Sequence, residues 1–89
     1  MTRRTVAVVG LGKIGLPLAV QYATRGHRVL GCDINPEVVE LVNSGIEPFP
    51  GEDSLETMLS NVVNNGSLEA TTDTSEAVRQ SRAVIVVVP

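Results

Sequence analysis

The chain has little of what nucleic-acid-binding, disulfide-stabilised or membrane-spanning proteins need. Its 89 residues carry a net charge of −3 and only two aromatic side chains, Tyr22 and Phe49. A nucleic-acid surface requires a basic stripe or a platform of stacking aromatics, and the sequence has neither. A single cysteine, Cys32, excludes an internal disulfide framework and fits a reducing compartment. No stretch approaches the ~20 apolar residues of a membrane span, so we expect a cytoplasmic protein with no nucleic-acid or membrane partner.

The most informative stretch is an apolar run that leads into three regularly spaced glycines. Residues 6–9 read Val-Ala-Val-Val, and Gly10, Gly12 and Gly15 follow with the spacing G-x-G-x-x-G. In a phosphate-binding turn the first glycine permits the tight turn and the second lets the backbone approach a pyrophosphate. The third lets the next helix pack against the strand. That helix then offers N–H groups and the positive end of its dipole to the anion.

Three further residues complete the predicted nucleotide site. We expect Lys13 and Ile14 to contribute backbone N–H groups to the pyrophosphate, with the Lys13 side chain pointing to solvent. Asp33 ends a second apolar run, where a carboxylate can accept hydrogen bonds from the ribose hydroxyls of an adenosine. Its charge favours NAD over NADP, because it would repel a 2′-phosphate and no cation follows it. The alternatives are a glycine turn of purely structural use and an acid that only caps the next helix.

The order of apolar runs and helix signals predicts an α/β fold. Strands are expected at about 5–9, 28–33, 68–71 and from 83 to the end, and helices at about 15–25, 36–44, 53–64 and from 74. This alternation predicts a partial Rossmann-type fold, with a parallel sheet of about four strands in the order 3-2-1-4 and flanking helices. On the first helix, the residues expected to face inward are Gly15, Leu18, Ala19, Tyr22 and Gly26. On the third, they are Leu55, Met58, Leu59, Val62 and Val63.

The last strand, Ala83 to Pro89, is expected to be an uncharged, β-branched edge. Such an edge is an aggregation hazard and normally has further strands beside it. We therefore interpret residues 1–89 as the N-terminal part of a dinucleotide-binding domain whose remainder is absent, and we expect self-association through this strand. The strand also lies at the topological switch point, where a ligand crevice opens. Val88 is accordingly expected to approach the middle of the cofactor.

The run from Gly10 to Ala19, Gly-Leu-Gly-Lys-Ile-Gly-Leu-Pro-Leu-Ala, resembles the N-terminus of UDP-glucose/GDP-mannose dehydrogenases, a nucleotide-sugar dehydrogenase family. Similar segments follow at 31–35, 41–48, 68–73 and in the closing valine strand. The resemblance implies binding of NAD, and a UDP-sugar substrate whose C6 alcohol is oxidised to a uronic acid in two NAD-dependent steps. It also implies that the catalytic cysteine belongs to a much later segment, so no catalytic residue is nominated and Cys32 is expected to be a small buried hydrophobe.

The sequence departs from the family pattern at a few positions. Lys13 stands where members often carry an aromatic residue, and Val38 where many carry a lysine or arginine that helps to bind the ribose. The loop at Glu47-Pro48 is as similar to UDP-N-acetyl-mannosamine or -glucosamine dehydrogenases as to the UDP-glucose enzymes. We expect Glu47 to be a solvated loop acid and His27 to lie at the surface or a strand edge.

Two other functions remain open at this point. One is the N-terminal domain of a β-hydroxyacid or 6-phosphogluconate-type dehydrogenase. The other is a non-enzymatic NAD-sensing regulatory module. The additional helix expected at 53–64 counts against both, because these proteins usually lack it.

Overall fold

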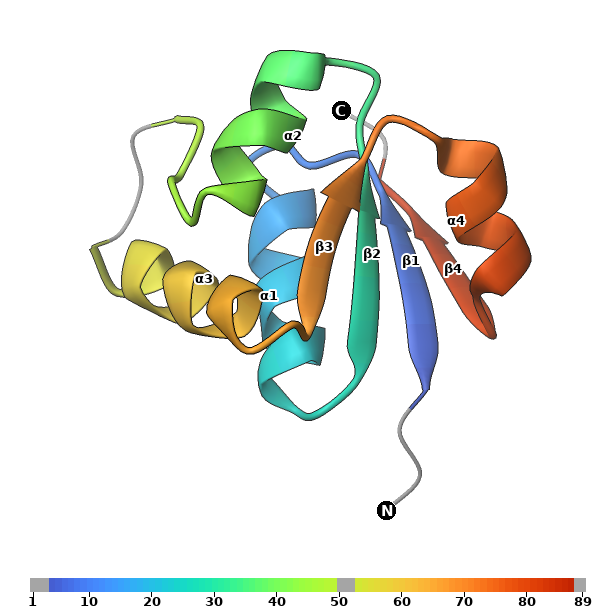
Figure 1. Ribbon diagram of the computed structural model, residues 1–89, viewed down its shortest axis with the longest axis horizontal. Coiled ribbons are helices and arrows are strands. Elements are labelled where there is room, and N and C mark those ends of the chain that lie inside the picture. The colour runs from blue at the N-terminus through green and yellow to red at the C-terminus, as the bar shows by residue number, and fades with distance from the viewer. Residues whose placement is uncertain (1–3, 50–52, 88–89) are drawn as a thin grey trace.

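The computed structural model describes residues 4–49 and 53–87, and its strands and helices are those that the sequence predicts (Figure 1). The strands are β1 (Thr5–Val9), β2 (Arg28–Cys32), β3 (Leu68–Thr71) and β4 (Ala83–Val86). The helices are α1 (Gly15–Thr24), α2 (Pro36–Asn43), α3 (Asp53–Asn64) and α4 (Thr74–Gln80). β2, α1 and α2 each end one residue earlier than expected. Val88 and Pro89 of the expected last strand lie outside the described residues.

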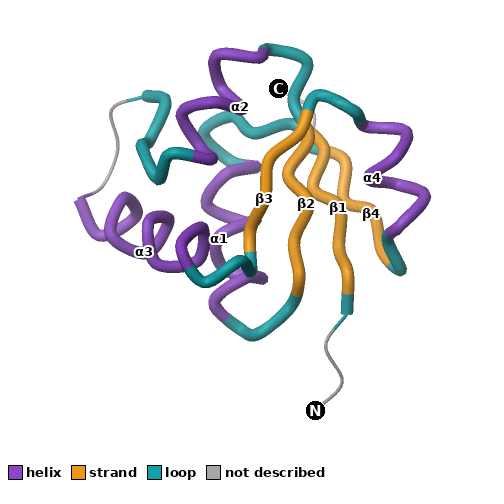
Figure 2. The backbone as a smooth tube through the Cα atoms, in the orientation of Figure 1, coloured by secondary structure: helices purple, strands orange, loops and turns teal. Residues whose placement is uncertain are grey.

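The four strands form one parallel sheet in the order β3-β2-β1-β4, which confirms the predicted topology (Figure 2). Thr5 pairs with Arg28, Val6 with Ala83, and Val29 with Leu68. Because all strands point the same way, their carboxyl ends meet at one edge of the sheet, the upper edge in Figure 2. The loops that follow β1, β2 and β3 therefore lie together at that edge.

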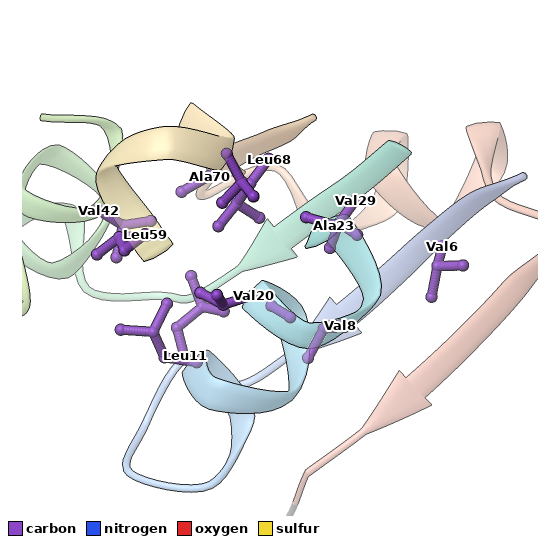
Figure 3. Packing of buried hydrophobic residues seen from close by; sticks show 13 residues of the cluster. Val6, Val8, Leu11, Val20, Ala23, Val29, Val42, Leu59, Leu68 and Ala70 are labelled. Carbon is purple, nitrogen blue, oxygen red and sulfur yellow. The ribbon is translucent and has the colours of Figure 1, made fainter. Parts of the chain in front are cut away.

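Helices cover both faces of the sheet. The main core lies between one face and α1, α2 and α3 (Figure 3). It includes Val6, Val8, Leu11, Leu16, Val20, Val29, Val42, Leu59 and Leu68. On the opposite face, Ala77 of α4 packs with Leu30 and Cys32. None of the helices in the described residues is long and apolar enough to cross a membrane.

The buried face of α1 is rotated from the expected one. Gly15 and Ala19 are buried as predicted, but Leu18 and Tyr22 are only partly buried and Gly26 is exposed. The remaining buried positions of the helix are Leu16, Val20 and Ala23. The expectation was wrong because α1 contacts α3 as well as the sheet, so its buried stripe serves two neighbours.

The inward face of α3 is close to the expected one. Leu59 and Val62 are buried, and Leu55 and Val63 are partly buried against the core. Met58 was expected to face inward but is 37% exposed. It flanks the buried stripe, and α3 lies at the outside of the helical layer (Figure 1).

The ends of α2 and α4 follow the sequence signals. The Asn35 side chain accepts a hydrogen bond from the Glu37 N–H, and Pro36 opens α2. Gly45, with φ +76°, lies just beyond the C-cap of α2, where the left-handed conformation favours glycine. Asp73 caps α4 by accepting from the Glu76 N–H at 3.1 Å. These local signals explain why the predicted boundaries hold.

The two edges of the sheet differ. At β3, the Asn43 side-chain amide donates to the Ala70 carbonyl oxygen at 2.9 Å and accepts from the Ala70 N–H at 2.8 Å, so α2 protects this edge. At β4, Val84 and Val86 are 41% and 65% exposed. The exposed apolar edge expected at the last strand is therefore confirmed.

Candidate functional site

The glycine turn connects β1 to α1 at the carboxyl edge of the sheet. The Gly10 N–H donates to the Cys32 carbonyl oxygen at 2.8 Å, which ties the turn to β2. Gly10 has φ +102°, and a Cβ there would lie 2.9 Å from the Val87 carbonyl oxygen. A Cβ on Gly15 would overlap the Gly10 carbonyl oxygen. Both glycines are therefore required by the geometry of the turn itself.

Gly12 is different, because no atom of the described residues requires a glycine there. A Cβ on Gly12 would meet nothing within 4 Å, its φ is not positive, and the residue is exposed. The backbone here lies open to a ligand that must approach closely. This is the role that the sequence pattern assigns to the second glycine.

The N-terminus of α1 is open beside Gly12. Its N-cap residue, Ile14, is 69% exposed and has no side-chain acceptor for the first N–H groups of the helix. The first turn carries no acidic residue. The Leu16 N–H already donates to the Gly12 carbonyl oxygen at 3.0 Å and Pro17 has no N–H, so it is the absence of a capping side chain and the positive end of the helix dipole that make this position suited to an anion. Lys13, between Gly12 and Ile14, is exposed as expected.

The Asp33 carboxylate links the glycine turn to the start of α2. Its Oδ2 accepts from the Leu11 N–H at 3.0 Å, and its Oδ1 accepts from the Asn35 N–H at 3.0 Å. The cap of α2 is Asn35, not Asp33. A carboxylate has about four acceptor positions, so Asp33 retains capacity for the hydroxyls of a ribose. Its side chain is partly exposed at the carboxyl edge.

A cavity of about 140 Å³ lies next to Asp33, lined by Val9, Gly10, Cys32, Asp33, Ile34 and Thr74. A cavity of about 150 Å³ can hold a benzene ring, so this one matches a single aromatic ring. Ile34, which lines this cavity, is 91% exposed and offers an apolar surface to a ligand. Sequence reasoning missed both Ile34 and Thr74. Ile34 directly follows Asp33, the residue predicted to bind the ribose, and this adjacency is the one signal in the sequence that could have identified Ile34 as a site residue.

Cys32 behaves as the predicted small hydrophobe. It is fully buried between the sheet and α4. Burial raises the pKa of the Cys32 thiol, the charge of Asp73 raises it further, and a hydrogen bond with Thr74 opposes this. A buried thiol with a raised pKa is a poor nucleophile at neutral pH.

His27 lies at a strand edge as expected, directly before β2, whereas Glu47 is placed differently from the sequence expectation. His27 is half-buried, its ring lies 6.1 Å from that of Tyr22, and its Nδ1 is buried without a partner in the described part of the chain. Glu47 is half-buried, and its Oε1 has no hydrogen-bond partner among those residues. It lines a cavity of about 470 Å³ with Gly45, Glu56, Thr57, Ser60 and Asn61. Glu47 is not the solvated loop acid that was expected, because the loop 46–49 folds onto α3, where the Glu56 side chain accepts from the Glu47 N–H.

The arrangement fits a dinucleotide at the carboxyl edge of the sheet. The exposed backbone at Gly12, the uncapped α1 and the Asp33 carboxylate lie around one crevice, as phosphate and ribose groups require. Val88, the remaining residue of the expected site, lies outside the described residues. No three His, Cys, Asp or Glu side chains within residues 4–49 and 53–87 could hold a metal ion.

The fold and this crevice define a Rossmann-type dinucleotide-binding domain. Residues 4–89 match the family described as "UDP-glucose/GDP-mannose dehydrogenase family, NAD binding domain". The chain belongs to this family of nucleotide-sugar dehydrogenases, and its cofactor is NAD. This match assigns the chain to the nucleotide-sugar dehydrogenases and to neither of the two alternatives, and α3, the additional helix that counted against both, is present.

Similar proteins act on several nucleotide sugars. The chain is 42% identical to a UDP-N-acetyl-D-mannosamine dehydrogenase of Campylobacter jejuni, over 94% of this chain and 19% of that protein. It is 36% identical to a GDP-mannose 6-dehydrogenase of Pseudomonas putida, over 93% of this chain and 19% of that protein. It superposes with a TM-score of 0.90 on a UDP-glucose dehydrogenase of Pyrobaculum islandicum, at 36% identity, covering 98% of this chain and 20% of that one. The chain thus spans about a fifth of the length of these relatives.

Proposed function

We propose that residues 1–89 are the N-terminal part of the NAD-binding domain of a longer nucleotide-sugar dehydrogenase that oxidises the C6 alcohol of a UDP-sugar to a uronic acid. The observation that carries this proposal is the open backbone at Gly12 beside the uncapped N-terminus of α1, with the Asp33 carboxylate across the crevice. The length of the relatives supports the longer protein.

Each residue of the crevice has a distinct part in holding NAD. Gly10 and Gly15 shape the turn, and Gly12, Lys13 and Ile14 present backbone to the pyrophosphate. The Asp33 carboxylate accepts from the adenosine ribose, and Val88 approaches the middle of the cofactor. The adenine lies against the cavity that Ile34 and Thr74 line, with one of its two fused rings inside.

NAD, when bound, accepts a hydride from the sugar, and this chain positions the cofactor for that transfer. We propose that the residues which act on the sugar belong to the remainder of the enzyme, so the isolated chain is inactive. A UDP-sugar is favoured over a GDP-sugar because the UDP-N-acetyl-D-mannosamine relative is 42% identical and the GDP-mannose relative 36%.

Titration calorimetry of the chain with NAD and with NADP tests the cofactor site. We expect NAD to bind and NADP to bind more weakly, since its 2′-phosphate meets Asp33. Asp33→Asn should weaken NAD binding by ~1.5–3 kcal/mol through loss of hydrogen bonds to a charged acceptor. Glu69→Gln removes one exposed carboxylate from β3, outside the group at the carboxyl end of the sheet, and should leave NAD binding unchanged. Equal NAD affinity of Asp33→Asn and the unmodified chain would remove Asp33 from the site.

The substrate is tested with the longer gene product that contains this chain. Incubation with NAD and, in separate reactions, UDP-N-acetyl-mannosamine, UDP-glucose and GDP-mannose should give NADH with a UDP-sugar. Two NADH should form per sugar oxidised to the acid. Oxidation of GDP-mannose alone would contradict the UDP-sugar assignment, and oxidation of none of the three would contradict the proposed activity.

A further inference from the structure

Positively charged side chains are distributed unequally between the two ends of the sheet. Among the described residues, the arginines lie at the amino end, just before or at the start of a strand or at the C-terminal end of a helix: Arg4, Arg25, Arg28, Arg79 and Arg82. Lys13 is the one basic side chain of the described residues at the carboxyl end. In Figure 1 this is the end toward which the strand arrows point.

Carboxylates gather around Lys13's end of the sheet. Asp33 follows β2, Glu37 lies in the first turn of α2, and Asp73 caps α4. The Debye length is about 8 Å at physiological ionic strength, so charges grouped at one edge act on a nearby ligand. A pyrophosphate that enters this crevice therefore meets negative charges, opposed by the partial positive charge of the α1 N-terminus.

The charge of Lys13 is available to such a ligand. Lys13 is exposed within the glycine turn. The ion pair found among the described residues joins Arg79 to Glu76, at 3.3 Å, and leaves Lys13 without a carboxylate partner there. A lysine ammonium on its flexible four-carbon stem can move to a phosphate oxygen without a change in the backbone.

We propose that the Lys13 ammonium pairs with the pyrophosphate of the dinucleotide and sets the affinity of the crevice for the phosphate part of its ligand. The inference rests on the proposed function, which places the pyrophosphate at the N-terminus of α1. It assigns Lys13 a side-chain role in addition to its backbone N–H. Ligands that contain the pyrophosphate gain affinity from Lys13, and ligands without phosphate gain none.

The experiment compares three ligands, adenosine, ADP-ribose and NAD, by titration calorimetry of the longer gene product that contains this chain. The variants are Lys13→Gln and Lys13→Arg. Arg25→Gln is the matched control, because it makes the same change in net charge at the opposite end of the sheet. Each titration is made at low and at high salt, and Asp33→Asn is measured alongside as a test of the ribose site.

Lys13→Gln should weaken ADP-ribose and NAD binding about fivefold at low salt, the upper range for an exposed ion pair. The loss should fall below about twofold at 0.5 M salt, because the charge is then screened. Adenosine binding should not change. Lys13→Arg should retain the affinity, and Arg25→Gln should match the unmodified chain.

Several outcomes would overturn the inference. If Lys13→Gln binds ADP-ribose normally while Asp33→Asn does not, Lys13 has no such role and the proposed function stands. An equal loss of adenosine binding in Lys13→Gln would show that Lys13 acts through the shape of the turn. An equal loss in Arg25→Gln would show a general effect of net charge. If the longer gene product that contains this chain binds none of the three ligands, the proposed function fails together with the inference.

Discussion

The contacts around the glycines distinguish a glycine that is needed for folding, Gly15, from one that is needed for binding NAD, Gly12. A Cβ on Gly15 would overlap the Gly10 carbonyl oxygen, whereas a Cβ on Gly12 would meet nothing within 4 Å. We predict that Gly15→Ala lowers the free energy of unfolding by about 1–3 kcal/mol or more, as overpacking does. Gly12→Ala should unfold at an unchanged urea concentration but bind NAD more weakly, because its methyl group occupies the approach of the pyrophosphate.

Urea denaturation and NAD titration of both variants check this prediction. Each glycine variant is the control for the other, since both add one methyl group to the same turn. A large loss of stability in Gly12→Ala, or full NAD affinity in that variant, would contradict the separation.

Cys32 gives the stability of the fold a dependence on alkaline pH. Burial raises the pKa of its thiol in the folded state, so the unfolded chain loses this proton first as the pH rises. The contribution of the thiol to stability is therefore complete below its ordinary pKa and is lost as the pH rises through the folded pKa. We predict that the free energy of unfolding falls as the pH rises above the ordinary pKa of a thiol, about 8.5, and that Cys32→Ala flattens this decline.

Chemical denaturation over this pH range measures the effect. Every other ionisable group is the same in both proteins, so the slopes of the two profiles are compared rather than their heights. A decline as steep in Cys32→Ala as in the unmodified chain would contradict the role of Cys32.

The position of a single residue could be predicted from the sequence where the order of strands and glycines alone determines it. Asp33 follows a strand at a fixed distance from the glycines, and the structure places it at the crevice as predicted. Its two hydrogen bonds to the N–H groups of Leu11 and Asn35 depend on how two segments meet, which no local pattern shows. The burial of Glu47 and His27 depends in the same way on tertiary packing.

At the scale of elements, Asn43 couples α2 to the edge of β3. Its side-chain amide makes two hydrogen bonds to the backbone of Ala70 and so takes the place of a neighbouring strand. We predict that Asn43→Ala lowers the free energy of unfolding by about 1–3 kcal/mol, because one N–H and one carbonyl lose partners. Asn64→Ala is the matched control, since the exposed Asn64 amide reaches only the Ser60 Oγ at 3.4 Å. Urea denaturation should show the smaller effect for Asn64→Ala, and equal effects would exclude the coupling.

The sequence predicted where elements begin and end better than which side each one buries. Caps such as Asn35 and Asp73 are local, so the bounds of α2 and α4 could be anticipated. The buried face of α1 could not, because it depends on α3 lying beside the helix. For the same reason the exposure of Met58 differs from its periodic position.

At the scale of the whole molecule, only one of the two edge strands of the sheet is protected. Asn43 occupies the hydrogen-bonding groups of Ala70 at the β3 edge, while Val84 and Val86 leave an apolar, uncharged surface at β4. In a parallel sheet, apolar side chains such as those of Val84 and Val86 are normally covered on both faces of the strand that carries them. The open edge is thus the position where another strand, from the longer protein or from a second copy, would extend the sheet.

We predict that the isolated chain self-associates through β4. Sedimentation velocity should show a concentration-dependent increase in mass that high salt does not remove, because the contact is apolar and made by backbone hydrogen bonds. Val84→Lys with Val86→Lys should give a monomer, since two ammonium groups on an edge oppose strand addition. Val78→Lys, on the exposed surface of α4, adds a similar charge away from the edge and should leave association unchanged. A monomer at high concentration of the unmodified chain would show that β4 does not recruit a second copy, and dissociation by salt would point to charged surfaces instead.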